Sequence, residues 1–141
     1  MKIVGIHLAP GRRLPIKSLE SVVAEADKGL VGDRYHGTAR LQVTIQSLDD
    51  LDRASAELGH GIAASATRRN LTVDSGVLPT KPGTRLAVGD VGLEVVRIVP
   101  PCRLLDDEIG PGAAAAMRGR GGTALRVLTS GTIRLGDAVT L

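Results

Sequence analysis

Short runs in which apolar and polar residues alternate dominate the chain. In the clearest run, Leu41, Val43 and Ile45 alternate with arginine, glutamine and threonine. A period of two predicts a half-buried strand here. Glycine (18 residues) and proline (7 residues) recur between such runs, which favours many short strands. The other runs that predict strands are residues 4–8, 70–73, 85–88, 92–99, 124–128, 132–135 and 138–141.

One predicted strand is irregular. Residues 92–99 alternate until Val95 and Val96 follow each other. The run therefore predicts either a β-bulge at this point or burial on both faces.

Two segments have helical character. Ser47 is suited to cap the first helix, with Asp50 as its capping-box partner, and Gly59 is suited to end it. The predicted inward stripe comprises Leu48, Leu51, Ser55 and Leu58. The second segment, residues 112–118, is rich in alanine, the best helix former.

Together these elements predict a mainly β protein. We expect a β-barrel of short, mostly antiparallel strands, with one or two capping helices over its ends. No linker or low-complexity segment divides residues 1–141, so we expect a single domain.

Composition restricts the core and the partners. Hydrophobic residues make up 43% of the chain, yet Tyr35 is its only aromatic residue apart from histidines. Leucine, valine, isoleucine and alanine must therefore fill the core. Nucleic-acid binding is disfavoured because aromatic stacking platforms are missing. No apolar stretch approaches the roughly 20 residues that span a bilayer. A free thiol and the lack of a signal-peptide pattern favour the cytoplasm.

The net charge is +3, and most of the positive charge is arginine. Arginine is suited to bidentate recognition of phosphate and carboxylate. A GC-rich coding sequence would also enrich the chain in arginine, so both interpretations stay open at this point.

Cys102 is the only cysteine, and it follows Pro100 and Pro101 at the end of a predicted strand. The two prolines hold the chain extended before the thiol. Arg103, next in the chain, favours the thiolate, which is the nucleophilic and metal-binding form. The alternative is a cysteine that serves as a small buried hydrophobe.

A second candidate segment lies between Gly32 and Gly37. The glycines let the backbone present Asp33, Arg34 and His36 together, and His36 can titrate near neutral pH. This segment is either a ligand-binding loop or an exposed loop with solvated charges.

Two further segments combine arginine with groups that suit anions. A strand that starts before Asn70 places Arg68 and Asn70 on one face and Arg69 on the other. Such a pair can hold a phosphate or the edge of a heterocycle; the alternative is an edge strand protected by charge. Arg120 and Gly121 lie in a glycine-rich turn, which either approaches an anion or simply joins helix and strand.

The sequence does not support a metal site built from protein ligands alone. It contains no CxxC and no HExxH, and His7, His36 and His60 are scattered. A metal held mainly by an organic cofactor, with Cys102 adding one sulfur, needs only one protein thiolate.

Taken in order, these segments resemble the MOSC domain, the module named for the C-terminal part of molybdenum-cofactor sulfurases. The resemblance extends from about residue 3 to the C-terminus. The segments that carry it are residues 29–37, 42–45, 67–71, 83, 86–90, 101–102, 119–122, 127, 131 and 133–137.

This resemblance implies a β-barrel, a functional cysteine at Cys102 and a molybdenum cofactor (molybdopterin). It makes Cys102 the molybdenum ligand or a carrier of sulfur as a persulfide. The phosphate and the pterin are assigned to Arg68, Asn70, Arg120 and Gly121, and the rim of the site to Arg34 and His36.

The resemblance also implies partners. No pyridoxal-phosphate site and no ferredoxin-like domain are visible in this chain, so a cysteine desulfurase or a separate electron-transfer protein is expected to assist it. Two alternatives remain open. One is a molybdenum-dependent reductase of N-hydroxylated compounds, and the other is a non-catalytic β-barrel that binds anions.

Overall fold

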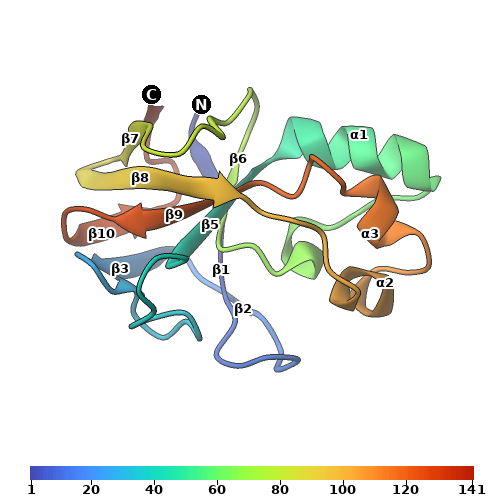
Figure 1. The fold of residues 1–141 in the computed structure, drawn as a ribbon, viewed down its shortest axis with the longest axis horizontal. Coiled ribbons are helices and arrows are strands. Elements are labelled where there is room, and N and C mark those ends of the chain that lie inside the picture. Colours follow the sequence, from blue (N-terminus) through green and yellow to red (C-terminus); the bar gives the residue numbers. More distant parts are fainter.

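Strands and helices occupy opposite ends of the protein. In the computed structural model, which describes residues 1–141, the strands gather at one end. The other end holds helices α1 (Leu48–Leu58), α2 (Leu104–Glu108) and α3 (Ala113–Ala116) (Figure 1). A 3₁₀ helix, η1 (Ala64–Thr67), precedes the strand β6 (Leu71–Val73). None of the helices has the length and apolar character that a bilayer crossing requires.

The strands form two sheets. The larger has eight strands in the order β11 (Val139–Thr140), β7 (Arg85–Val88), β8 (Val91–Ile98), β9 (Thr123–Val127), β5 (Val43–Ser47), β6, β1 (Ile3–Leu8) and β2 (Lys17–Ser18). The smaller has the order β10 (Gly131–Arg134), β3 (Ser21–Glu25) and β4 (Gly29–Leu30).

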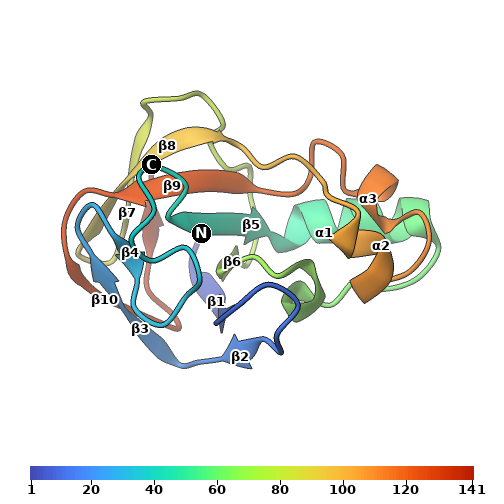
Figure 2. The ribbon, with the colours of Figure 1, turned by 60° about the horizontal axis from the view of Figure 1, so that its bottom comes forward.

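The larger sheet curls on itself (Figure 2). A bridge between Lys2 and Ala138 joins the start of β1 to the chain before β11, so the two sides of the curl meet. The parallel pair of the fold is β5 with β6, and α1 and η1 form the crossover between them. The predicted mainly β fold of mostly antiparallel strands is thus confirmed, although three α-helices cover one end rather than one or two.

The core contains no aromatic side chain. A cluster of 20 buried leucine, isoleucine, valine and alanine residues fills the barrel. A second cluster of seven, which includes Met117, lies under the three helices. The four residue types expected from composition therefore fill the barrel, and the curled sheet supplies the rigid wall that positions the candidate site.

The strand β5 is buried on both faces, so its predicted half-burial is wrong. Val43 and Ile45 face the barrel core, but Gln42 and Gln46 are buried as well. The Gln46 amide donates to Thr72 and accepts from Thr67, so burial leaves this polar group satisfied. Apolar and polar residues alternate in β5 because one of its faces carries polar side chains that are buried and hydrogen-bonded. The sequence pattern cannot distinguish such side chains from solvated ones.

The predicted bulge in β8 is confirmed. Val95 pairs with Leu125 and Arg97 with Ala124 on β9, so Val96 is the extra residue. A bulge bends the strand and redirects the side chains that follow it. It therefore sets the direction of Arg97 and Ile98, which both line the cavity described below.

The caps of α1 agree only in part with the prediction. The Ser47 hydroxyl accepts from the Asp49 amide, and Gly59 ends the helix in the left-handed conformation, both as expected for caps. Asp50 is not the capping-box partner, because its carboxylate pairs with Arg53. The carboxylate of Asp49 instead accepts from the amide of Gly76.

Among the elements that were not predicted are β3 and α2. In β3, Val22 and Ala24 are buried and Val23 is exposed, but three consecutive apolar residues hide the period of two. Helix α2 has five residues, which is too short to show helical periodicity. It forms because Leu105 packs into the helical cluster.

Replacing Gly122 by alanine should destabilise the protein strongly. Gly122 has φ +91°, and a Cβ there would overlap the carbonyl oxygen of Ile45 in β5. The left-handed conformation alone costs about 1–2 kcal/mol. With the backbone overlap we expect a loss of about 3 kcal/mol or more in the free energy of unfolding, measured by urea denaturation. Gly61→Ala is the control, because a Cβ there meets open space. Equal losses in both variants would contradict the steric argument.

The buried ring of His7 should make stability depend on pH. His7 in β1 is 9% exposed, and its Nδ1 has no hydrogen-bond partner. Burial lowers the pKa of His7 below its ordinary value. The unfolded chain therefore binds the proton more readily, so stability should be full above about pH 6.5 and fall as the pH drops below it. His7→Gln should flatten this slope and the surface variant His60→Gln should keep it; three equal slopes would refute the assignment.

Candidate functional site

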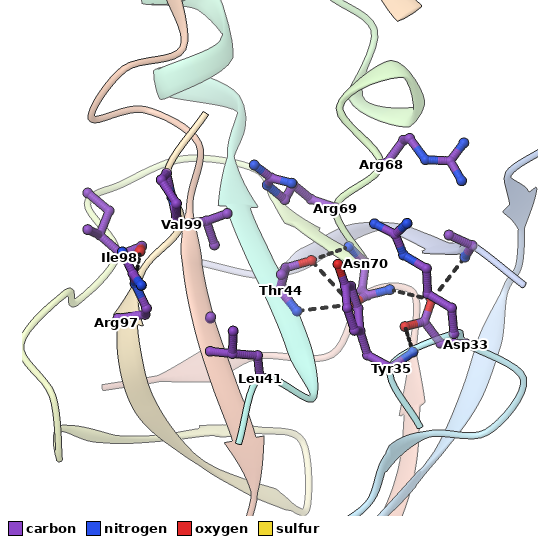
Figure 3. Close-up of a pocket in the computed structure, with 14 residues that line it drawn as sticks. Asp33, Tyr35, Leu41, Thr44, Arg68, Arg69, Asn70, Arg97, Ile98 and Val99 are labelled. Atoms are coloured by element: carbon purple, nitrogen blue, oxygen red, sulfur yellow. Dashed lines mark hydrogen bonds between the residues drawn. The ribbon is translucent and has the colours of Figure 1, made fainter. Parts of the chain in front are cut away.

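An arginine-lined cavity of about 150 Å³ opens at the junction of barrel and helices. Four arginines line it, namely Arg34, Arg68, Arg69 and Arg97, against one acid, Asp33. Figure 3 shows Arg69 and Arg97 on different sides of the cavity, with Thr44 and Asn70 at its centre. The excess of guanidinium groups makes the cavity suitable for an anion.

Asn70 and Asp33 form the polar centre of this cavity. The Asn70 Oδ1 accepts from the Thr44 amide at 2.9 Å, and its Nδ2 donates to the His7 carbonyl and to Asp33, each at 3.1 Å. Asp33 also accepts from the amide of Ala9. Three separate segments, β1, β5 and the loop after β4, are thereby joined at one buried point.

Arg68 and Asn70 do not share a strand face, so that prediction is wrong. Arg68 is left-handed, with φ 63°, and lies before β6, where strand alternation does not apply. Its guanidinium donates to the carbonyls of Gly11 and Leu14, and it lies 3.6 Å from Glu108 of α2. The side chain is only 5% exposed. Arg68 therefore anchors the β1–β2 loop and α2 beside the cavity.

Arg69 lines the cavity together with Arg68 and Asn70, although strand alternation predicted that it would lie on the opposite face. Its Nε donates to the Gly121 carbonyl at 2.7 Å, which fixes the guanidinium at the cavity wall. Burial lowers the pKa of Arg69, while the nearby Cys102 and Tyr35 act in the opposite direction. Arg69 thus lies within electrostatic reach of both the cavity and the thiol.

Two cavity arginines have buried nitrogen atoms without partners. The Nε atoms of Arg34 and Arg68 are buried and make no hydrogen bond. Each such donor costs free energy unless a ligand or solvent satisfies it. The guanidinium of Arg34 also lies 4.6 Å from the centroid of the Tyr35 ring, which places both side chains at the cavity mouth.

Cys102 lies outside this cavity and is exposed. The chain leaves the cavity wall at Pro100, two residues earlier. The thiol opens into a separate basin, where Arg12, Arg13 and Arg103 outnumber the two acids, Asp106 and Asp107. The amide of Leu104, the first residue of α2, donates to the Cys102 Sγ at 3.3 Å. The alternative of a buried hydrophobic cysteine is therefore wrong.

Of the remaining predicted residues, His36 and Arg120 lie apart from the cavity. His36 faces Glu25, with 3.0 Å between its Nε2 and the carboxylate. Arg120 pairs with Glu57 of α1 at 2.7 Å. Gly121 contacts the site through its carbonyl, which holds Arg69. Of the residues chosen from sequence, the structure brings Arg34, Arg68 and Asn70 together at the cavity, and Cys102 into the neighbouring basin.

Sequence reasoning missed Arg69 and Arg97 as cavity residues. The signal for Arg97 was the adjacent bulge, which redirects the end of β8. For Arg69, the sequence contained no signal, because the left-handed turn at Arg68 is not evident from residue types.

The family model of the MOSC domain matches residues 32–140. This chain belongs to the MOSC domain family. Several solved structures share the fold of this chain. The YuaD protein from Bacillus subtilis has a TM-score of 0.84 and 19% identity, over 98% of this chain and 93% of that one. YiiM from Escherichia coli has a TM-score of 0.75 and 17% identity, over 100% and 69%. YiiM from Geobacillus stearothermophilus has a TM-score of 0.70 and 19% identity, over 99% and 72%.

A search of the curated proteins found no match to this chain. At these identities the solved structures establish the MOSC fold alone. The chemistry of this MOSC site must therefore be argued from its own residues.

Asp33→Ala should destabilise the protein and loosen the cavity loop. The change leaves the amides of Ala9 and Tyr35 and the Asn70 side chain without a shared acceptor. We expect a loss of about 2–4 kcal/mol in the free energy of unfolding, measured by urea denaturation, because several buried donors lose their partner together. Asp90→Ala, in the exposed turn between β7 and β8, is the control and should stay within about 0.5 kcal/mol. A loss equally small for Asp33→Ala would contradict its central role.

Proposed function

We propose that this MOSC protein binds the molybdenum cofactor by an anionic end and uses Cys102 as a molybdenum ligand or a persulfide carrier. The observation that carries the proposal is the cavity itself. It gathers four arginines around one acid, and two of the guanidinium groups have buried Nε donors without partners. Such donors suit a phosphate, which accepts several charge-assisted hydrogen bonds.

The cavity fits one end of such a ligand rather than the whole. Its volume of about 150 Å³ is below the roughly 300–1,000 Å³ of typical small-molecule sites. A phosphate or a single ring can enter, and the rest of the ligand would lie at the mouth. No group of three or more possible metal-ligating side chains occurs in the structure. A metal would therefore be held by its organic cofactor together with Cys102.

The arginines would bind the anion, whereas Asn70 would position the cavity wall. Arg69 and Arg34 would hold the anion, because Arg69 is fixed through Nε alone and Arg34 has an unpartnered donor. Asn70 already has protein partners on both its oxygen and its nitrogen. Its role would be to position the cavity wall rather than to contact the ligand. When bound, molybdenum would supply a centre for redox or sulfur chemistry.

The exposure of Cys102 favours the persulfide alternative. A partner such as a cysteine desulfurase could present its own persulfide at the open basin. The Cys102 thiolate would attack the outer sulfur, the partner's S–S bond would break, and the partner would leave as its thiolate. Arg12 and Arg103 in the basin would favour an anionic reactant. A reductase role would instead require an electron-transfer partner at the same face.

Molybdenum content tests the proposal. Protein from a host with intact cofactor synthesis should contain near-stoichiometric molybdenum by elemental analysis, and the pterin should be detected after oxidation by its fluorescence. Arg69→Gln should lower both at least about tenfold, because a charged hydrogen-bond donor contributes about 1.5–3 kcal/mol. Cys102→Ser should abolish a persulfide, measured by mass spectrometry.

Arg118→Gln is the matched control, because Arg118 is exposed and lines neither the cavity nor the basin. It should leave molybdenum and pterin contents unchanged. Wild-type protein without molybdenum, pterin or persulfide would refute the proposal, and so would equal loss in the Arg69 and Arg118 variants.

A further inference from the structure

A shallow groove continues from the mouth of the cavity. We call it the Tyr35 groove; its walls include Tyr35, Leu41 and Arg97, which it shares with the cavity, together with Arg40 and Val96. Figure 3 shows Leu41 between Arg97 and Tyr35 in this region. The groove therefore adjoins the proposed cofactor cavity but has side chains of its own.

The floor of the Tyr35 groove is formed by exposed side chains that are largely apolar. Tyr35 is 37% exposed and Leu41 is 43% exposed. Ile98, which lines the adjoining cavity, is 38% exposed. The Arg34 guanidinium lies over one face of the tyrosine ring, so the other face is the one a ligand could cover. A flat apolar body can cover such a surface by stacking on the ring and removing the leucine from water.

Positive charge flanks this floor without compensation. No acidic residue lines the groove, and the side chain of Arg40 makes neither an ion pair nor a hydrogen bond. The Arg97 Nε donates only to the carbonyl of the adjacent Ile98, at 3.2 Å. Two exposed guanidinium groups therefore keep donors available for an anionic group on a ligand.

We infer that the Tyr35 groove binds a flat aromatic molecule that carries one carboxylate, as the substrate class of the adjacent site. Its role as a substrate site rests on the proposed function; the binding itself does not. The aromatic body would cover Tyr35 and Leu41, and the carboxylate would lie between Arg40 and Arg97. A small anion alone would leave the apolar floor in water, and a neutral aromatic would leave both arginines unpaired.

The chain contains its own reporter for this groove. Apart from Tyr35 and three histidines it has no aromatic side chain, so the aromatic carbon NMR spectrum of labelled protein isolates Tyr35. Titration with 2-naphthoate should shift the Tyr35 signals saturably. The neutral isostere 2-naphthamide should bind at least about threefold more weakly, as expected for exposed charge pairs of up to about 1 kcal/mol. Added salt should weaken only the naphthoate.

Variants separate the groove from the cavity. Arg40 lines the groove alone, and Arg69 lines the cavity alone. Arg40→Gln should weaken 2-naphthoate binding about threefold, and the double variant with Arg97→Gln about tenfold. Arg118→Gln is the control and should bind like the wild type. Equal affinity for naphthoate and naphthamide, or naphthoate binding that survives the double variant unchanged, would overturn the inference.

The two proposals fail in different ways. If the purified protein holds molybdenum but 2-naphthoate leaves the Tyr35 signals unmoved, the groove is wrong and the proposed function stands. If naphthoate binds as described but no molybdenum, pterin or persulfide is found, the proposed function is wrong and the groove is a binding site in its own right. Arg40→Gln should retain the molybdenum content of the wild type, and a parallel loss would also overturn a separate groove.

Discussion

The side-chain amide of Asn70 joins the segments on which the site depends. It accepts from β5 through the Thr44 amide and donates to β1 through the His7 carbonyl. Its second hydrogen reaches Asp33 in the loop after β4. Asp33 then holds the amide of Tyr35 and so places the aromatic ring at the cavity mouth. Because each buried group satisfies the next, removing one leaves several unpaired, and the cavity wall is specified as a unit.

The buried arginines divide into supports and ligand-binding groups according to how the backbone satisfies them. Arg68 donates to two carbonyls and faces Glu108, so its charge is largely used in holding the β1–β2 loop and α2. Arg69 is held by one carbonyl, that of Gly121, which leaves the outer nitrogens of its guanidinium for other partners. Desolvation penalises its charge. A bound anion would offset this penalty, and this makes Arg69 the centre of the proposed binding site.

Features that depend on local pattern were accessible from the sequence, and features that depend on turn geometry were not. The β class, the cap at Ser47 and the bulge at Val95-Val96 follow from periodicity and residue type. The positions of Arg68 and Arg69 depend on a left-handed residue after η1, which shifts the phase of every side chain beyond it. Residue types do not reveal such a shift, because arginine has no preference for that conformation.

The separation of thiol and cavity bears on the chemistry of the site. Cys102 is connected to the cavity wall through Pro100 and Pro101, which restrict the backbone between them. Arg69 lines the cavity and also interacts electrostatically with Cys102. A ligand anchored by its anionic end in the cavity would therefore extend outside it to meet the thiol, in a basin open to a second protein. The same openness would permit transfer from a partner and would leave a bound metal accessible to substrate. In the proposed function the arginine-lined cavity would retain the ligand, and the exposed basin would permit exchange with a partner.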